Sequence, residues 1–352
     1  MMKKTVLAAL SVLIAVSLSA ASTGDALKTY VTKALAKCPD SKITIEALDR
    51  MGPANFVPYT VVQTSSDTTC GRQAILLHSP ATNQVVIGTV FALPIDDRSA
   101  EVRVAETAST LLKTNVTASI AAFPLPDGLR ALSLTKETPW GPFSYHGFLD
   151  ASQQFLIVGT RGSLFVDPAA TLVESLGVEN AVHRGNAKSR IKIIELSDFE
   201  CPTCAKAHKR VEPLIAANLS KVEYLRLDLP LFEHHEWALP AALGARAIRK
   251  VAPSKYWTYV NFVFENQETI DKAGAFEKVL QNFCEDHDID WKRVEKIYNS
   301  RAERSAILDQ VSRAFDNGVN STPTYIINGQ IMGFGPDGSY TIAAIKKALG
   351  VK

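Results

Sequence analysis

The segment that most restricts how this chain can fold lies at residues 190–231, where two apolar runs flank a helical pattern. The runs are RIKIIELSDF (190–199) and VEYLRLDLPL (222–231), and both are rich in apolar residues, as buried strands are. Between them, PTCAKAHKRVEPLIAANL (202–219) has apolar residues at helical spacing. A strand, a helix and a strand in this order favour a parallel pair joined by a right-handed crossover. The C-terminal half is therefore predicted to be a small α/β unit.

The turn between the first of these strands and the helix contains two cysteines, in FECPTCA (199–205). Cys201 lies at the turn and Pro202 at the first helical position, where unpaired backbone N–H groups and the positive end of the helix dipole favour a thiolate. Cys204 follows one turn later on the same helix, close enough to form a disulfide with Cys201. We interpret the two as a switchable redox pair, with Cys201 as the nucleophile and Pro202 and Thr203 as the spacer.

Three other interpretations compete with the redox pair. A zinc site made of Cys201, Cys204 and His208 would need a second group of ligands, and no other close Cys/His pair stands out. Haem attachment requires a histidine directly after the second cysteine, where this chain has Ala205. A static disulfide at this spacing would close almost no loop and restrain little chain entropy. No metal or cofactor is therefore predicted.

The rest of the C-terminal half adds helices and a hairpin. Residues from about 232 to 315 have several helical patterns and form a predicted insertion. After them, TYIING and QIMGFG flank Asn328-Gly329, a dipeptide favoured in tight hairpin turns. The chain then closes with TIAAIKKALG, a predicted helix that ends at a glycine.

The N-terminal half, residues 22–180, has a different pattern. Short alternating or β-branched runs are punctuated by turn residues, as in KITIEAL, FVPYTVV, RQAILLH, NQVVIGTVFAL and LRALSLTKE. Helical spacing occurs in ALKTYVTKALAK (26–37) and AEVRVAETASTLLKT. These residues are predicted to form a separate, mostly antiparallel α+β domain. The polar stretch ENAVHRGNAKSR (179–190) is predicted to be a linker to the second domain, residues 181–352.

The first 21 residues have the features of an export signal. Lys3 and Lys4 precede an apolar run from Val6 to about Leu18, and small residues suited to cleavage follow. The run is shorter than the roughly 20 residues that span a bilayer, so an uncleaved anchor is the weaker alternative. Removing the two lysines takes away the whole formal net charge of +2, which leaves no electrostatic case for nucleic acid or an anionic membrane as partner. A periplasmic or otherwise extracytoplasmic location is predicted.

Two separated motifs resemble one family. ELSDFECPTC, the helical insertion and VNSTPTYIINGQ make residues 188–351 similar to the DsbA-like thiol:disulfide oxidoreductases of the thioredoxin superfamily. The resemblance implies a thioredoxin-like fold with a helical insertion. It also implies that Thr322 and Pro323 lie beside the redox cysteines, with a cis bond that lets the backbone pair with a client peptide.

Glu195 matches a family position in the first strand. The resemblance implies a buried acid that moves a proton for Cys204, and the apolar neighbours of Glu195 favour burial, where a carboxyl group titrates high. The alternative is that Glu195 points to the other side of the strand and is solvated.

The resemblance implies an exported enzyme that exchanges disulfides with cysteine-containing clients and a membrane or soluble redox partner. Pro202 and Thr203 supply no positive charge between the cysteines, and Thr322 resembles the isomerase and DsbG-like branch, so a weaker oxidant, or a reductase or isomerase, is expected. In that branch an additional N-terminal domain serves homodimerisation and client binding. The alternative from another class is a chaperone or metal-binding module with a structural or vestigial cysteine pair.

Three further cysteines remain. Cys38 follows a predicted helix and Cys70 lies in the turn-like SSDTTCGR. In an oxidising compartment, two cysteines within one domain are more often bonded than free, so a structural Cys38–Cys70 disulfide is predicted. Cys284, in the apolar-spaced FEKVLQNFCEDH, is then the odd thiol.

Several polar residues near the redox turn are given no role. Asp198 and Glu200 flank the turn and are expected to be surface charges, while His208 is expected on the exposed face of the helix. His234 and His235 are expected to begin or cap a helix.

Overall fold

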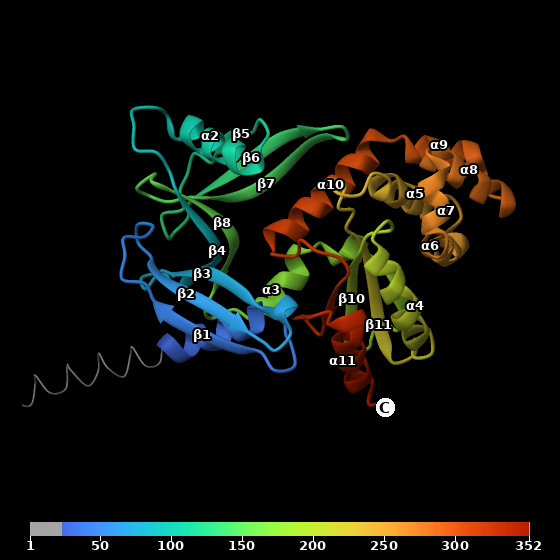
Figure 1. Cartoon of the computed structure of the whole chain (residues 1–352), viewed down its shortest axis with the longest axis horizontal. Helices are drawn as coiled ribbons and strands as arrows, with labels where there is room; N and C mark the ends of the chain where they lie inside the picture. Colours follow the sequence, from blue (N-terminus) through green and yellow to red (C-terminus); the bar gives the residue numbers. More distant parts are fainter. Residues whose placement is uncertain (1–22, 352) are drawn as a thin grey trace, which may run out of the picture.

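The structure, a computed structural model, describes residues 23–351, and these residues form two sheets with helices around each (Figure 1). The predicted signal peptide, residues 1–21, lies outside the described residues. Within the described range, no helix has the length and apolar character needed to cross a membrane. The predicted fold class, a thioredoxin-like α/β unit preceded by an α+β domain, is confirmed.

The N-terminal domain is built on one eight-stranded sheet in which every neighbouring pair is antiparallel. The strands, in the order in which they lie side by side, are β1 (Lys42–Ala47), β2 (Val57–Thr64), β3 (Arg72–His78), β4 (Gln84–Ala92), β8 (Phe155–Ser163), β7 (Gly141–Leu149), β6 (Arg130–Thr138) and β5 (Thr117–Ile120). The runs recognised by their alternation thus become strands of a single sheet.

Two helices cover different parts of this sheet. A helix over residues 23–34 packs Leu27 and Val31 against side chains of β2, β3 and β4. Helix α2 (Ala100–Leu112) packs Val104 against side chains of β6 and β8. A short helix, α3 (Pro168–Ser175), follows β8 and leads to the second domain. Each helix has one apolar face, which the sheet buries.

The C-terminal domain contains the predicted strand, helix and strand. Strands β10 (Ile191–Ser197) and β11 (Val222–Asp228) are parallel, and α4 (Pro202–Ala216) connects them. The other strands of the sheet are β9 (Val182–Gly185), β12 (Thr324–Ile327) and β13 (Gln330–Met332), and the order across the sheet is β13-β12-β10-β11-β9. Helices α4 and α11 (Ser339–Leu349) pack on the face that carries Ile193.

The helical insertion lies between β11 and β12. Its helices are α5 (Ala238–Val251), α6 (Tyr256–Glu265), α7 (Gln267–Ala273), α8 (Phe276–Asp286), α9 (Trp291–Tyr298) and α10 (Arg301–Asp316). Figure 1 shows α6 to α9 grouped at the end of the molecule away from the N-terminal domain, and α10 running back toward it. Cys284 lies on α8 and is fully buried in the apolar core of this group.

The predicted linker, residues 179–190, contains a strand instead. Strand β9 pairs with β11 in antiparallel register, with Gly185 opposite Glu223. Its Arg184 lies over the Trp257 ring, 4.9 Å from the centroid, and forms an ion pair with Glu212. The prediction was wrong because an edge strand with polar, half-exposed side chains has the composition of a linker.

The two domains touch at several places, which include an ion pair between Lys136 of β6 and Glu233. At a first contact, residue 37 continues the C-terminal sheet beyond β13: Lys37 N donates to Ile331 O at 2.8 Å, and Gly333 N donates to Lys37 O at 2.9 Å. At the second, the C-terminal end of α10 meets β7. The backbone N–H of His146 donates to Asp316 Oδ1 at 3.1 Å, and the ring Nδ1 of His146 lies 2.7 Å from Asp316 Oδ2. The domains are therefore joined by hydrogen bonds as well as by the chain.

Cys38 and Cys70 form a disulfide that spans a sequence separation of 32. The bond lies against the C-terminal domain, because a Cβ added to Gly333 would come within 2.4 Å of Cys38 Sγ and 3.2 Å of Cys70 Sγ. It thus holds together the chain segment that extends the second sheet, beside the first contact between the domains.

Candidate redox site

Cys201 and Cys204 lie at the carboxyl end of β10, where the chain enters α4. Cys201 is the residue before the helix, with Pro202 at its first position, and both cysteines are thiols in this structure. Cys201 is 8% exposed and Cys204 is completely buried. Gln267, from α7, fixes the turn by donating to Phe199 O at 2.7 Å and to Cys201 O at 3.1 Å. The thiols are therefore held by the strand, the helix and the insertion together.

The pKa values of the two thiols are shifted in opposite directions. A hydrogen bond from the Cys204 thiol lowers the pKa of Cys201 to about 6, Thr322 acts in the same direction, and burial acts against both. Burial raises the pKa of Cys204 well above its usual range, and the adjacent Cys201 raises it further. The Asp198 backbone N–H, whose nitrogen is 3.5 Å from Cys204 Sγ, only partly offsets this rise. Near neutral pH, Cys201 is a thiolate and Cys204 a thiol.

The loop before β12 faces the Cys201 sulfur. The bond between Thr322 and Pro323 is cis, and Thr322 O lies 3.6 Å from Cys201 Sγ. The structure therefore brings both residues of this loop beside the redox turn, although about 120 positions of sequence separate them.

Glu195 is buried, with 2% of its surface exposed, so its solvated alternative is wrong. The Tyr224 hydroxyl donates to Glu195 Oε2, while Glu195 Oε1 has no hydrogen-bond partner in the part of the chain that the structure describes. By strand alternation Glu195 shares a face of β10 with Ile193, which packs against Ala207 of α4. Its carboxyl group therefore lies on the side of the sheet that α4 covers.

Arg226 was missed by the sequence reasoning. It lies opposite Glu195 in the register of β10 and β11 and is 1% exposed. Its guanidinium forms an ion pair with Asp228 and stacks on the Phe199 ring, 4.2 Å from the centroid. A single arginine in the apolar run VEYLRLDLPL was the available signal, because a charge inside a buried strand needs a partner.

Asp198 and Glu200 are not the surface charges that were expected. Asp198 is 1% exposed and accepts hydrogen bonds from Leu231 N at 2.8 Å and His235 Nδ1 at 2.7 Å. Glu200, half-buried, accepts from Trp237 N at 2.6 Å at the start of α5. The prediction was wrong because the loop after β11 folds back onto the redox turn, and these two carboxylates bind its backbone.

His235 thereby becomes part of the redox site. Its hydrogen bond to Asp198 raises its pKa, burial acts against this, and the charges of Asp198, Glu200 and Cys201 raise it further. His234 and His235 lie in the loop before α5, whose N-terminal cap is Trp237, so the expectation that they begin or cap a helix was wrong. His235 therefore brings an imidazole from another loop toward the redox turn, where the charge of Cys201 acts on its pKa.

His208 is also buried, at 8% exposure, and not on an exposed helix face. Its Nε2 bonds Asn261 Oδ1 at 2.8 Å, and its ring packs 4.8 Å from that of Phe264. The prediction failed because α6 of the insertion covers this side of α4.

Over residues 23–351, no group of three or more His, Cys, Asp or Glu is arranged to hold a metal ion.

Comparisons with known proteins show what the C-terminal domain is similar to. Residues 178–350 match the family described as Thioredoxin. The probable disulfide bond formation protein D of Bacillus anthracis is 25% identical over 170 residues, which cover 47% of this chain and 76% of that protein. The Na(+)/H(+) antiporter NhaA 3 of Salinispora tropica is 28% identical over 166 residues, 47% of this chain, and the chain spans only 24% of the antiporter's length.

A solved structure is also similar. Oxidised BdbD from Bacillus subtilis has a TM-score of 0.44 and 17% identity, over 49% of this chain and 95% of that one. The family match, together with the strand, cysteine turn and helix, defines the C-terminal domain as a thioredoxin-like domain. Its similarity to the disulfide bond formation protein D of Bacillus anthracis agrees with the resemblance that the two sequence motifs carry.

Proposed function

We propose that this protein is an extracytoplasmic thiol:disulfide oxidoreductase that exchanges disulfides with cysteine-containing clients through Cys201 and Cys204. One observation carries the proposal: two adjacent thiols at a strand-to-helix turn have pKa values shifted in opposite directions, to about 6 for Cys201 and well above the usual range for Cys204. A thiolate is the form that attacks a disulfide, and a protonated neighbour can resolve the product later.

In the reducing direction, the Cys201 thiolate attacks one sulfur of a client disulfide. The client S–S bond breaks, a mixed disulfide forms and the other client sulfur leaves as a thiolate. Cys204 then loses its proton and attacks Cys201 Sγ, which releases the second client thiol and forms the Cys201–Cys204 disulfide. The client gains two electrons and the enzyme loses two, and the oxidising direction is the same sequence reversed.

Glu195 is the proposed acceptor for the Cys204 proton. It is buried on the side of the sheet that α4 covers, and Glu195 Oε1 is without a hydrogen-bond partner among the described residues. Thr322 and Pro323 are proposed to frame the client backbone, because their loop faces the Cys201 sulfur.

The acidity of Cys201 bears on the direction of electron flow. The pKa of Cys201 is about 6, while the most oxidising enzyme of this class has a cysteine pKa of roughly 3.5 and a potential of roughly −120 mV. A less acidic nucleophile stabilises the reduced form of the pair less, so this pair is expected to be more reducing than that enzyme. We propose a weak oxidant, suited to reduction or isomerisation of clients.

A trapping experiment tests the proposal. Cys204→Ala leaves Cys201 without its resolving partner, so mixed disulfides with clients should accumulate and run as reductant-sensitive bands on nonreducing gels. Cys284→Ala, which removes the buried thiol of α8 and leaves Cys201 and Cys204 intact, is the matched control and should accumulate none. A folded Cys204→Ala variant without such bands would contradict the proposed activity.

A further inference from the structure

Two hollows lie between the N-terminal sheet and the C-terminal domain. We name the first, of about 490 Å³, the polar hollow; it lies between the helix over residues 23–34, strands β3, β4 and β8, and residues 315–321. We name the second, of about 440 Å³, the apolar hollow; it lies between α2, strands β4 and β6 to β8, and residues 230–234. The two hollows are adjacent, and we call them together the interdomain cleft, because the same five side chains border both: Thr89, Tyr145, Val158, Phe315 and Asn320.

The redox cysteines line neither hollow, but two loops connect the cleft with the redox site. Asn320, which borders both hollows, is two residues before Thr322, whose carbonyl oxygen lies 3.6 Å from Cys201 Sγ. Leu231, in the wall of the apolar hollow, donates its backbone N–H to Asp198 at 2.8 Å. The two loops that contact the redox turn are therefore also walls of the apolar hollow.

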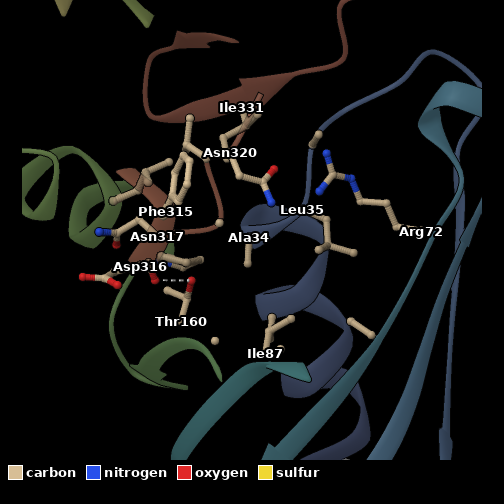
Figure 2. Close-up of a pocket in the computed structure, with 18 of the residues that line it drawn as sticks. Ala34, Leu35, Arg72, Ile87, Thr160, Phe315, Asp316, Asn317, Asn320 and Ile331 are labelled. Carbon is tan, nitrogen blue, oxygen red and sulfur yellow. Dashed lines mark hydrogen bonds between the residues drawn. The ribbon is translucent and has the colours of Figure 1, made fainter. Parts of the chain in front are cut away.

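The two hollows have different linings. The apolar hollow is lined mainly by leucine and phenylalanine side chains, with Glu233 and His234 at the loop before α5. Two of the leucines, Leu111 and Leu112 of α2, remain 48% and 37% exposed. In the polar hollow, Figure 2 shows the Arg72 and Asn320 side chains pointing toward one another across the open space, with Asn317 and Asp316 on the same loop as Asn320. Exposed apolar side chains gathered in a hollow mark a binding surface, and polar groups beside them suit a peptide backbone.

We propose that this interdomain cleft binds an extended segment of an unfolded client and holds a large apolar client side chain in the apolar hollow while the client cysteine meets Cys201. The inference rests on the proposed function and names the substrate class. A free acyl chain fits less well, because the polar hollow with Arg72 and Asn320 lies directly beside the apolar one. The volume of the apolar hollow suits one or two large side chains, and most of its walls belong to the N-terminal domain.

The test compares two disulfide-bonded peptides, one with leucine and phenylalanine beside its cysteine and one with serine at both positions. The unaltered protein should reduce the apolar peptide at least about tenfold more efficiently, as kcat/KM. Leu111→Glu should abolish this preference, because it places a charge in the apolar hollow. Val102→Glu is the matched control: Val102 is on the same helix, 43% exposed and outside both hollows, and its variant should keep the preference.

Reaction with oxidised glutathione separates the two proposals. This reaction should proceed at equal rates in the unaltered protein, Leu111→Glu and Val102→Glu. If none of the three reacts with oxidised glutathione, the proposed function itself is contradicted. Two results would contradict client binding in the cleft while glutathione still reacts normally. One is equal rates for the two peptides, and the other is a preference for the apolar peptide that persists in Leu111→Glu. A Leu111→Glu variant that shifts from dimer to monomer would also contradict client binding in the cleft, because a second copy would then be the occupant.

A second measurement does not depend on Leu111. The apolar peptide, carrying a photoreactive phenylalanine beside its cysteine, is captured on Cys204→Ala and irradiated. Crosslinks should map to α2 and residues 230–234. Crosslinks confined to the helical insertion would contradict the proposed site.

Discussion

Two cysteine pairs in this protein have opposite properties. Cys201 and Cys204 are three residues apart, are both thiols and have pKa values displaced in opposite directions. Cys38 and Cys70 are 32 apart, are bonded, and lie against Gly333 at the junction of the domains. A bond between distant residues removes much chain entropy from the unfolded state, whereas one within a single helical turn removes little. The first pair is therefore suited to exchange and the second to stability.

The largest expected effect separates the pairs by activity. Cys201→Ser should reduce client disulfide exchange to the uncatalysed level, because the alcohol that replaces the thiolate cannot form a disulfide. The double variant Cys38→Ser, Cys70→Ser should retain activity. Insulin reduction by both proteins measures this. An active Cys201→Ser variant would remove the distinction between the pairs.

Stability should respond in the opposite way. Loss of the Cys38–Cys70 bond should lower the free energy of unfolding by about 3 to 4 kcal/mol and reduce Tm, because the bond closes a long loop. Each single variant should lose as much as the double variant, since either one removes the bond. Calorimetry of the oxidised proteins checks this, and an unchanged Tm would show that the disulfide is not structural.

Gly333 tests whether this disulfide supports the contact between the domains. Gly333→Ala would place a Cβ within 2.4 Å of Cys38 Sγ, so the disulfide and Gly333 must move apart. We expect this to lower the free energy of unfolding by about 1 to 3 kcal/mol. Gly24→Ala is the control, because nothing lies within 4 Å of the added Cβ. Chemical denaturation of the two variants gives the comparison. Equal stability of both would contradict the close packing at Gly333.

A smaller effect is expected from His235. Its protonated ring favours the Cys201 thiolate, so His235→Gln should raise the pKa of Cys201 by up to about one unit, read from the pH dependence of alkylation. The control variant His234→Gln should leave the pKa of Cys201 unchanged. Because pairing with Asp198 raises the pKa of His235 in the folded protein, the pair contributes its full stability below pH of about 6.5 and loses it as pH rises through the folded-state value. An unaltered alkylation profile would show that His235 does not act on Cys201.

The local pattern of the sequence predicted most of the elements that hold the two pairs. Alternation identified the strands of the N-terminal sheet, and the two motifs of the C-terminal half located Cys201 and the loop at Pro323. The pairing of strands was not predictable in the same way. Strand β8 joins β4 across a long stretch of sequence, and nothing in either strand specifies its partner.

The polar environment of the redox turn was largely missed. Asp198, His208 and His235 were assigned from their own segments, but each is hydrogen-bonded to a residue more than 30 positions away in the chain. The same holds for the interdomain cleft, whose walls come from both domains. The homodimer predicted from the additional domain stays a prediction.

The most direct test of the central claim is a redox titration read by peptide mapping. The protein is equilibrated in glutathione buffers of graded potential, quenched with acid and alkylated, and the oxidised fraction of each cysteine pair is measured. The account predicts a two-electron transition for Cys201 and Cys204 at a potential more reducing than the roughly −120 mV of the strongest oxidant of this class, with Cys38 and Cys70 bonded throughout. A Cys201–Cys204 pair that does not change state across the series, or that titrates together with Cys38 and Cys70, would contradict it.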